Sequence, residues 1–323
     1  MSRLSLGTMN FGGRTDTQTS NRIIAAALDA GVNFIDTADV YNEGRSEEIV
    51  GAAIRSRRDR VILATKLGNP MGEDENMRGL SRRRVMAAAE ASLLRLGLDH
   101  IDIYYLHRED HETALEETVR AMGDLMRDGK IRYFGVSNFR AWRIAEVCNL
   151  CDRMGIERPV VCQPYYNLVN RMPETEILPA CGNYGLGVVP YSPVARGILS
   201  GKYKAGSPPP RDSRVAVSDR RMMQTEWRKE SLKVAARLEK HAKKKRMSLP
   251  VFATAWVLAN RLVTSVIAGP RTLEQWNSYL PALDARIDEK DEALVDRLVS
   301  PGHPSTPGYN DPGYPLEGRI RRG

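Results

Sequence analysis

Asp36, Lys66 and His107 each end a short apolar run, and the three runs follow one another along the chain. Tyr41 comes five residues after Asp36. Each of these residues alone has an ordinary structural explanation, such as a helix cap, a lysine in solvent or a histidine in the core. Their placement at the ends of successive runs instead favours one shared catalytic site.

The four side chains together suit the reduction of an aldehyde or ketone, which adds hydride to carbon and a proton to oxygen. The Tyr41 hydroxyl can supply the proton as general acid, although the ordinary pKa of tyrosine is about 10. An ammonium group beside it would lower that pKa, and Lys66, held charged by Asp36, is the candidate. We expect His107 to donate a hydrogen bond to the carbonyl oxygen and to orient the substrate. Running in reverse, the same group would oxidise an alcohol.

Short apolar runs alternate with longer amphipathic segments, which predicts parallel strands joined by helices. The expected strands are Leu4–Gly7, Asn33–Asp36, Val61–Lys66, Ile101–His107, Tyr133–Val136, Val160–Gln163, Gly187–Tyr191 and Ser265–Ala268. The expected helices lie near residues 18–30, 46–56, 82–96, 113–128, 141–154, 174–184, 229–260 and 272–284.

This alternation predicts an α/β protein, a (β/α)8 TIM barrel that spans residues 1–323 as a single domain. In such a barrel the active site forms at the C-terminal ends of the strands, where Asp36, Lys66 and His107 stand. An open, doubly wound sheet is the alternative. It is disfavoured because no G-x-G-x-x-G follows the first strand, where a dinucleotide would need it.

Two segments interrupt the alternation, and both are expected to be long loops at the C-terminal face of the barrel. Residues 192–228 are polar and contain Pro208-Pro209-Pro210, and residues 300–323 form an irregular tail that contains five prolines. We expect this tail to cover the barrel mouth. The candidate substrate pocket therefore consists of Met9, Phe11, Arg108 and the segments 68–79, 192–228 and 300–323.

Composition excludes several other classes of protein. The net charge is +8, but the densest basic runs are short and lie in helix-like segments, so no nucleic-acid partner is expected. Met1–Met9 lacks the apolar core of a signal peptide, and no run is long enough to span a membrane. We therefore expect a cytoplasmic protein with a small-molecule carbonyl or alcohol substrate and no membrane partner.

Cys148 and Cys151 form a C-x-x-C pair, which raises the question of a metal or redox site. They lie within an amphipathic segment, near residues 141–154, rather than in a loop or at a helix start. Redox and zinc motifs are usually found in loops or at helix starts. We expect these thiols to pack in the core and expect no metal.

Four segments, taken in order, resemble the signatures of the aldo-keto reductase superfamily. They are Gly31–Tyr41 with Gly44, Ser46 and Glu47; Gly129–Arg132 with Gly135–Phe139; Pro190–Pro193 with Gly197, Leu199, Gly201 and Lys202; and Val266–Thr272 with Gln275. The resemblance covers roughly residues 4–284. It implies a (β/α)8 barrel that binds NADP(H) in an extended form, with Asp36, Tyr41, Lys66 and His107 as the catalytic tetrad.

The resemblance also implies a set of cofactor contacts. Ser137, Asn138 and Gln163 would hold the nicotinamide carboxamide, and Tyr191 would stack on the nicotinamide ring. Ser192, Val194 and Gly197 would cross the pyrophosphate. The C-terminal cofactor segment includes Gly269; in it Arg271 and Thr272 would lie near the adenosine 2′-phosphate and Gln275 near the adenine. An arginine suits a phosphate dianion, which favours NADP over NAD.

Two departures from the family pattern stand out. The N-terminal β-hairpin that usually closes the barrel bottom is reduced or absent, since the first strand begins at Leu4. Tyr279 stands where the family has an asparagine, so adenine contacts are expected to differ.

Two other functions remain as alternatives. Some relatives of this fold bind the cofactor tightly and attach to ion channels as regulatory or redox-sensing subunits, although no appended interaction domain is recognised in this chain. Lys66 would alternatively form a Schiff base in a barrel lyase or isomerase, which the neighbouring Asp36 disfavours by keeping the amine charged.

Overall fold

Eight short parallel strands form a single sheet that closes on itself. The computed structural model describes residues 1–204 and 207–315. The sheet order is β7-β6-β5-β4-β3-β2-β1-β8, and the hydrogen bond from the Ile267 amide to the Pro190 carbonyl (2.9 Å) joins the two ends. The strands are β1 Leu4–Gly7, β2 Phe34–Asp36, β3 Ile62–Leu67, β4 Ile101–Leu106, β5 Ile131–Ser137, β6 Val161–Gln163, β7 Gly187–Val188 and β8 Val266–Ala268. The predicted (β/α)8 barrel is therefore confirmed.

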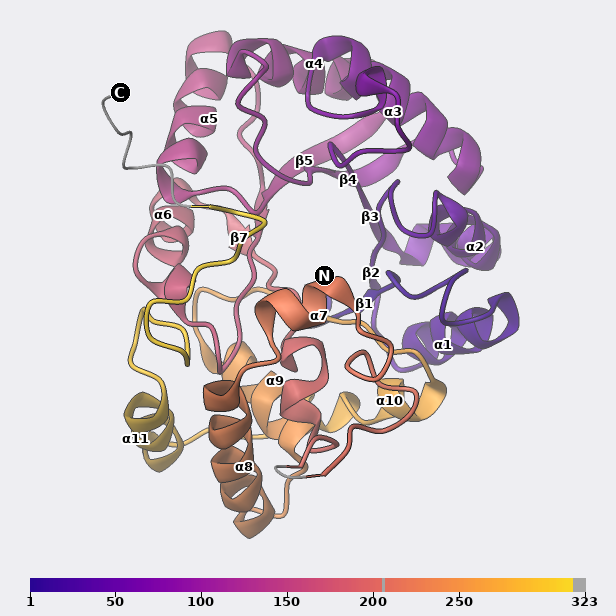
Figure 1. The fold of residues 1–323 in the computed structure, drawn as a ribbon. Coiled ribbons are helices and arrows are strands. Elements are labelled where there is room, and N and C mark those ends of the chain that lie inside the picture. Colours follow the sequence, from indigo (N-terminus) through magenta and orange to yellow (C-terminus); the bar gives the residue numbers. More distant parts are fainter. Residues whose placement is uncertain (205–206, 316–323) are drawn as a thin grey trace.

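Helices lie around the barrel, and those up to residue 184 follow one another in chain order (Figure 1). They are α1 Thr17–Asp29, α2 Arg45–Ile54, α3 Arg82–Leu96, α4 Leu115–Arg127, α5 Ala141–Met154, α6 Ile177–Tyr184, α7 Arg220–Thr225, α8 Lys229–Lys244, α9 Leu249–Ala259, α10 Leu273–Asn277 and α11 Glu289–Leu298. Among the described residues, none of these helices is long and apolar enough to cross a membrane.

The alternation of side chains along each strand separates two hydrophobic layers. Ile35 of β2 packs in the layer between the strands and the helices, whereas Phe34 packs with Ala64 and Tyr105 inside the barrel. A residue two positions after an inward one also faces inward. Asp36, Lys66 and His107 come two positions after the inward-facing Phe34, Ala64 and Tyr105, respectively. All three polar side chains therefore point into the barrel, at the end where the strands finish.

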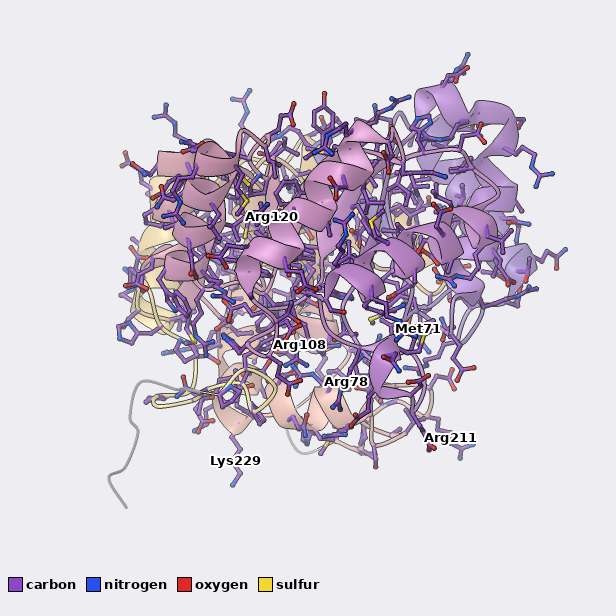
Figure 2. All side chains as sticks on the ribbon, turned by 90° about the horizontal axis from the view of Figure 1, so that it is seen from above. Met71, Arg78, Arg108, Arg120, Arg211 and Lys229 are labelled. Atoms are coloured by element: carbon purple, nitrogen blue, oxygen red, sulfur yellow. The ribbon has the colours of Figure 1, made fainter. Side chains whose placement is uncertain are left out.

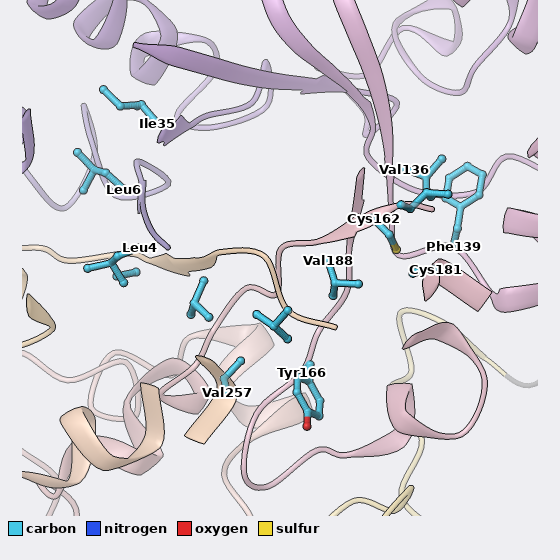
Figure 3. Close-up of a cluster of buried hydrophobic side chains, with 14 of the residues drawn as sticks. Leu4, Leu6, Ile35, Val136, Phe139, Cys162, Tyr166, Cys181, Val188 and Val257 are labelled. Atoms are coloured by element: carbon cyan, nitrogen blue, oxygen red, sulfur yellow. The ribbon is translucent and has the colours of Figure 1, made fainter. Parts of the chain in front are cut away.

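The outer layer contains all four cysteines as buried free thiols. Cys162 on β6 and Cys181 on α6 lie next to each other in this layer (Figure 3). Burial raises the pKa of Cys148 to about 11 and that of Cys151 to about 12, so both thiols are protonated at neutral pH. The expectation that the C-x-x-C pair packs in the core is confirmed.

The prediction of one helix over 229–260 was wrong, because the chain breaks there into α8 and α9. Arg246 has a positive φ of 57°, and Ser248 begins the new helix by accepting a hydrogen bond from the Val251 amide. Pro250 then occupies the first turn of α9, where its missing N–H costs nothing. The predicted helix over 272–284 likewise ends early, at Asn277, and a separate 3-10 turn with Pro281 follows.

Two helices were not predicted. The first, α11, begins with a capping box between Asp288 and Asp291. The second, α7, lies inside the long segment 192–228, which also contains a 3-10 segment at Ala195–Ser200. The first strand, β1, begins at Leu4, as expected.

The C-terminal segment up to Pro315 lies along one side of the barrel opening, beside α6 and β7 (Figure 1), and Pro312, Gly313 and Tyr314 line the cavity there. Arg221 of α7 forms two hydrogen bonds with Asp311 (2.9 and 2.5 Å), and the Arg228 guanidinium lies 3.7 Å from the centre of the Tyr309 ring. These contacts fasten the tail to the 192–228 loop. The part of the predicted tail after Pro315 lies outside the described residues.

Candidate active site

The Lys66 ammonium connects the members of the predicted tetrad. Its Nζ lies 2.5 Å from Oδ1 of Asp36, 2.7 Å from the carbonyl oxygen of Thr37 and 3.2 Å from the Tyr41 hydroxyl. The Tyr41 ring meets the His107 ring edge to face, with 6.0 Å between their centres. The four residues that the sequence singled out therefore lie together at one end of the barrel.

Burial and charge act in opposite directions on these groups. Burial raises the pKa of Tyr41, and the neighbouring Lys66 ammonium only partly offsets this effect. Burial alone would lower the pKa of Lys66, but the Asp36 carboxylate and Tyr41 raise it above its usual value. The expectation that Lys66 brings the pKa of Tyr41 below the usual value was thus wrong, because desolvation of the phenolate outweighs the charge. Tyr41 is protonated and Lys66 is charged at neutral pH.

His107 is neutral at neutral pH. Burial, the Lys66 ammonium and the Arg108 guanidinium all lower its pKa well below the usual value. Its Nδ1 is buried and has no hydrogen-bond partner within residues 1–204 and 207–315. Because His107 also lines the cavity above the barrel, Nε2 is the ring nitrogen available to a molecule bound there.

A second group of polar side chains comes from the ends of β5 and β6. Gln163 donates to Oδ2 of Asp36 (2.8 Å), and the hydroxyl of Ser137 donates to the Gln163 carbonyl (2.9 Å). Asn138 has a positive φ of 59° and accepts a hydrogen bond from the Tyr191 hydroxyl (2.8 Å). The amide nitrogen of Gln163 is therefore engaged by Asp36, whereas Ser137 and Asn138 lie at the cavity wall.

A cavity of about 1020 Å³ opens over these residues. That volume accommodates a dinucleotide together with a small substrate. Three of the four tetrad residues line it, and Lys66 lies beneath them. Of the predicted cofactor contacts, those that line the cavity are Ser137, Asn138, Gln163, Tyr191, Ser192, Val194, Gly197, Gly269, Arg271 and Gln275.

Thr272 does not line the cavity in the described part of the chain. Its side chain accepts a hydrogen bond from the Gln275 amide (3.2 Å) and begins α10. Gln275 in turn accepts from the Arg271 amide (2.8 Å). Tyr279, the departure from the family pattern, is buried and lines the cavity at this end.

The cavity wall is strongly cationic. Seven arginine and lysine side chains line it against two carboxylates, those of Asp36 and Glu274; the cations are Arg108, Arg196, Lys202, Arg214, Arg220, Arg221 and Arg271. Sequence reasoning named Arg271 for the cofactor and Arg108 for the pocket, and it assigned the segment 192–228 to the pocket without indicating which of its side chains face inward. Of the other five, Arg220 and Arg221 begin α7, and the remaining three lie outside this helix in the segment 192–228, where no periodic pattern indicates which side chains face inward.

Three cations form a cluster that fits phosphate. Burial lowers the pKa of Lys202, and Arg271 and Arg214 lower it further by repulsion. Arg214 is paired with Asp219 (2.7 Å), but within the described residues neither Lys202 nor Arg271 has a carboxylate oxygen within 4.0 Å. Like charges held together without counter-charge are relieved by a bound anion. The residues present therefore fit the phosphates of a nicotinamide dinucleotide.

The barrel and its tetrad define a protein of the aldo/keto reductase class, and a model of the aldo/keto reductase family matches residues 3–300. The chain belongs to this family, and it is an oxidoreductase of the nicotinamide-dependent type. The predicted resemblance is confirmed.

Curated relatives align over nearly the whole chain. A probable voltage-gated potassium channel subunit beta from Oryza sativa subsp. japonica is 38% identical over 91% of this chain and 93% of the relative. An uncharacterized oxidoreductase from Bacillus subtilis (strain 168) is 36% identical over 96% of each chain. A putative aryl-alcohol dehydrogenase from Schizosaccharomyces pombe is 31% identical over 93% of each chain.

Proposed function

We propose that this protein is an NADPH-dependent carbonyl reductase that converts aldehydes or ketones to alcohols, reversibly, with Tyr41 as the general acid. The single observation that carries the proposal is the hydrogen-bonded group of Asp36, Lys66 and Tyr41 beside a neutral His107, at the floor of a cationic cavity. A buried ion pair next to a hydroxyl at a cavity floor is costly to fold and suits proton transfer.

Each residue then has a distinct task. Bound NADPH supplies the hydride. His107 donates a hydrogen bond from Nε2 to the carbonyl oxygen, which fixes the orientation of the carbonyl next to Tyr41. Tyr41 transfers its proton to that oxygen, and the Lys66 ammonium stabilises the phenolate left behind. Asp36 keeps Lys66 charged, and Gln163 holds the second oxygen of Asp36.

The preference for NADPH over NADH rests on the phosphate-binding cluster of Lys202, Arg214 and Arg271. The cluster lies beside Gln275, at the predicted adenine end of the cavity, where only NADPH carries an additional phosphate. The charge of that phosphate matches guanidinium and ammonium groups directly.

Titrations of the purified protein with NADPH and NADH, followed by tryptophan fluorescence, test the cofactor. We expect micromolar or tighter binding of NADPH and at least tenfold weaker binding of NADH, a difference of about 1.4 kcal/mol. Arg271→Gln should remove most of this difference by weakening NADPH alone, whereas Arg286→Gln, outside the cavity, should leave it unchanged. Equal affinity for both nucleotides would refute the phosphate assignment.

NADPH oxidation with a panel of aldehydes and ketones tests the reaction. A protein that binds NADPH but reduces none of them contradicts the proposal. That result would favour the second candidate, a channel-associated subunit, which the identity to probable potassium channel subunits supports. Co-purification with a membrane partner would then be the deciding measurement.

A further inference from the structure

Arg108 is a cation at the barrel mouth that the proposed mechanism does not use. It directly follows His107 and lines the same cavity. The residue is exposed, and its guanidinium carbon lies 5.8 Å from the centre of the Tyr314 ring in the C-terminal segment. Figure 2 shows Arg108 at the end of the molecule where this segment crosses.

The position of Arg108 separates it from the phosphate-binding cluster. Arg108 follows β4, and Arg271 follows β8. In the closed ring of eight strands, β4 and β8 are four strands apart in either direction, so they are diametrically opposite. A nucleotide with its phosphates at Lys202 and Arg271 does not place those charges at Arg108. The guanidinium is therefore left for a different anion.

The carboxylates nearest to Arg108 in the sequence and in the tail have other partners. Glu109 accepts from the amide of Arg140 (2.6 Å), and Asp110 accepts from the amide of Leu80 (2.7 Å). Asp311 accepts hydrogen bonds from both terminal nitrogens of the Arg221 guanidinium. Within the described residues, no carboxylate oxygen lies within 4.0 Å of the Arg108 guanidinium.

We infer that Arg108 is a specificity-determining residue, and that the preferred substrates are aldehydes or ketones that carry a carboxylate on the side away from the carbonyl. A planar guanidinium binds a carboxylate with two parallel hydrogen bonds. A single guanidinium matches a single negative charge better than a phosphate dianion. The ring of Tyr314 beside it would pack against an aromatic or alkyl body between the two groups. This inference rests on the proposed carbonyl reductase function.

The test compares 4-formylbenzoate with 4-formylbenzamide, which has nearly the same shape and no charge. For the natural sequence we expect a higher kcat/KM with the benzoate. Arg108→Met should lower the benzoate-to-benzamide ratio about tenfold through KM, since a charged hydrogen bond is lost while the tetrad is intact. Arg108→Lys should retain part of the preference. Arg120→Met makes the same change on the exposed surface of α4, away from the mouth (Figure 2), and should leave the ratio within twofold.

A binding measurement makes the comparison independent of turnover. In calorimetry with NADPH bound, 4-(hydroxymethyl)benzoate should bind about tenfold more weakly to Arg108→Met than to the natural sequence. Raising the salt from about 0.05 to about 0.5 M should weaken its binding to the natural sequence but not to the variant, which lacks the charge of Arg108. If both aldehydes are reduced and the ratio is the same in all variants, the role of Arg108 is wrong while the reductase function stands. If neither aldehyde is reduced and the benzoate alcohol does not bind, both proposals fail.

Discussion

Nζ of Lys66 lies 2.5 Å from Oδ1 of Asp36, and both side chains are almost completely shielded from solvent. The second oxygen of Asp36 accepts from Gln163, which comes from β6, the strand opposite β2 in the ring. One carboxylate thus connects both sides of the barrel and orients the ammonium beside Tyr41. This arrangement leads to the first predictions.

Tyr41→Phe should lower kcat by about 10²- to 10⁴-fold, the usual contribution of a general acid. The variant removes one oxygen atom and leaves the ring against His107, so NADPH affinity should stay within about twofold. Stopped-flow rates of NADPH oxidation and a fluorescence titration measure the two effects. Full activity in this variant would rule out Tyr41 as the proton donor.

Lys66→Met should destabilise the protein by about 3–5 kcal/mol, because it leaves the Asp36 carboxylate buried without its counter-charge. Asp36→Asn/Lys66→Met removes both charges and should recover a large part of that loss. Urea unfolding of both variants gives the comparison. A double variant as unstable as Lys66→Met would show that packing, rather than the uncompensated charge, sets the cost.

His107 should make folding stability depend on pH. Its pKa in the folded protein lies well below the usual value of 6.5, mainly through burial, so the unfolded chain binds more protons below that pH. Stability is therefore fully present above pH 6.5 and decreases as the pH falls below it. His107→Gln lacks this titrating group. When the pH falls from about 7 to about 5, the unfolding free energy of the natural sequence should therefore decrease more than that of the variant. A difference that is constant over this range would mean that His107 is not held neutral.

Gly51 of α2 and Gly182 of α6 should respond in opposite ways to alanine. A Cβ at Gly51 would lie 2.0 Å from the Leu96 carbonyl oxygen at the end of α3, and backbone would have to move. Gly51→Ala should therefore cost about 1–3 kcal/mol. A Cβ at Gly182 meets only the end of the Leu262 side chain at 3.2 Å, so Gly182→Ala should be neutral or stabilise by up to about 1 kcal/mol. Thermal unfolding distinguishes them, and equal effects would contradict the close α2–α3 contact.

The strands and the tetrad could be predicted because they follow local rules. A strand alternates its side chains, and parallel strands of a barrel end at one face, so Asp36, Lys66 and His107 had to meet if the strands were correct. The same rule accounts for Ser137 and Gln163, which stand two positions after the inward-facing Gly135 and Val161. Tyr41 lies in a loop, and its place in the site was recognised through its chemistry and the family resemblance.

The break between α8 and α9 shows where local rules were insufficient. The apolar spacing continues across it, but Arg246 adopts a left-handed conformation, and the Ser248 cap with Pro250 starts a new helix. The new helix α9 then packs against α8 and against segments distant in the sequence, such as the 3-10 turn Leu280–Leu283, and no short pattern encodes these contacts. The helix α11 was not predicted, although the capping box at its start is recognisable in the sequence. Its outer face is charged and its apolar face is short, so the apolar spacing that indicates a helix is weak.

The sequence by itself determined the barrel, the candidate catalytic residues and candidate phosphate ligands such as Arg271, because these depend on periodicity, residue type and short spacing. Only the tertiary structure decided that Arg196, Lys202 and Arg214 face the cavity, because the irregular backbone around them has no period from which to infer direction. It also decided the charge states. Burial outweighs the Lys66 ammonium at Tyr41 and helps to keep His107 neutral, and desolvation depends on every segment packed around a group rather than on its neighbours in the chain.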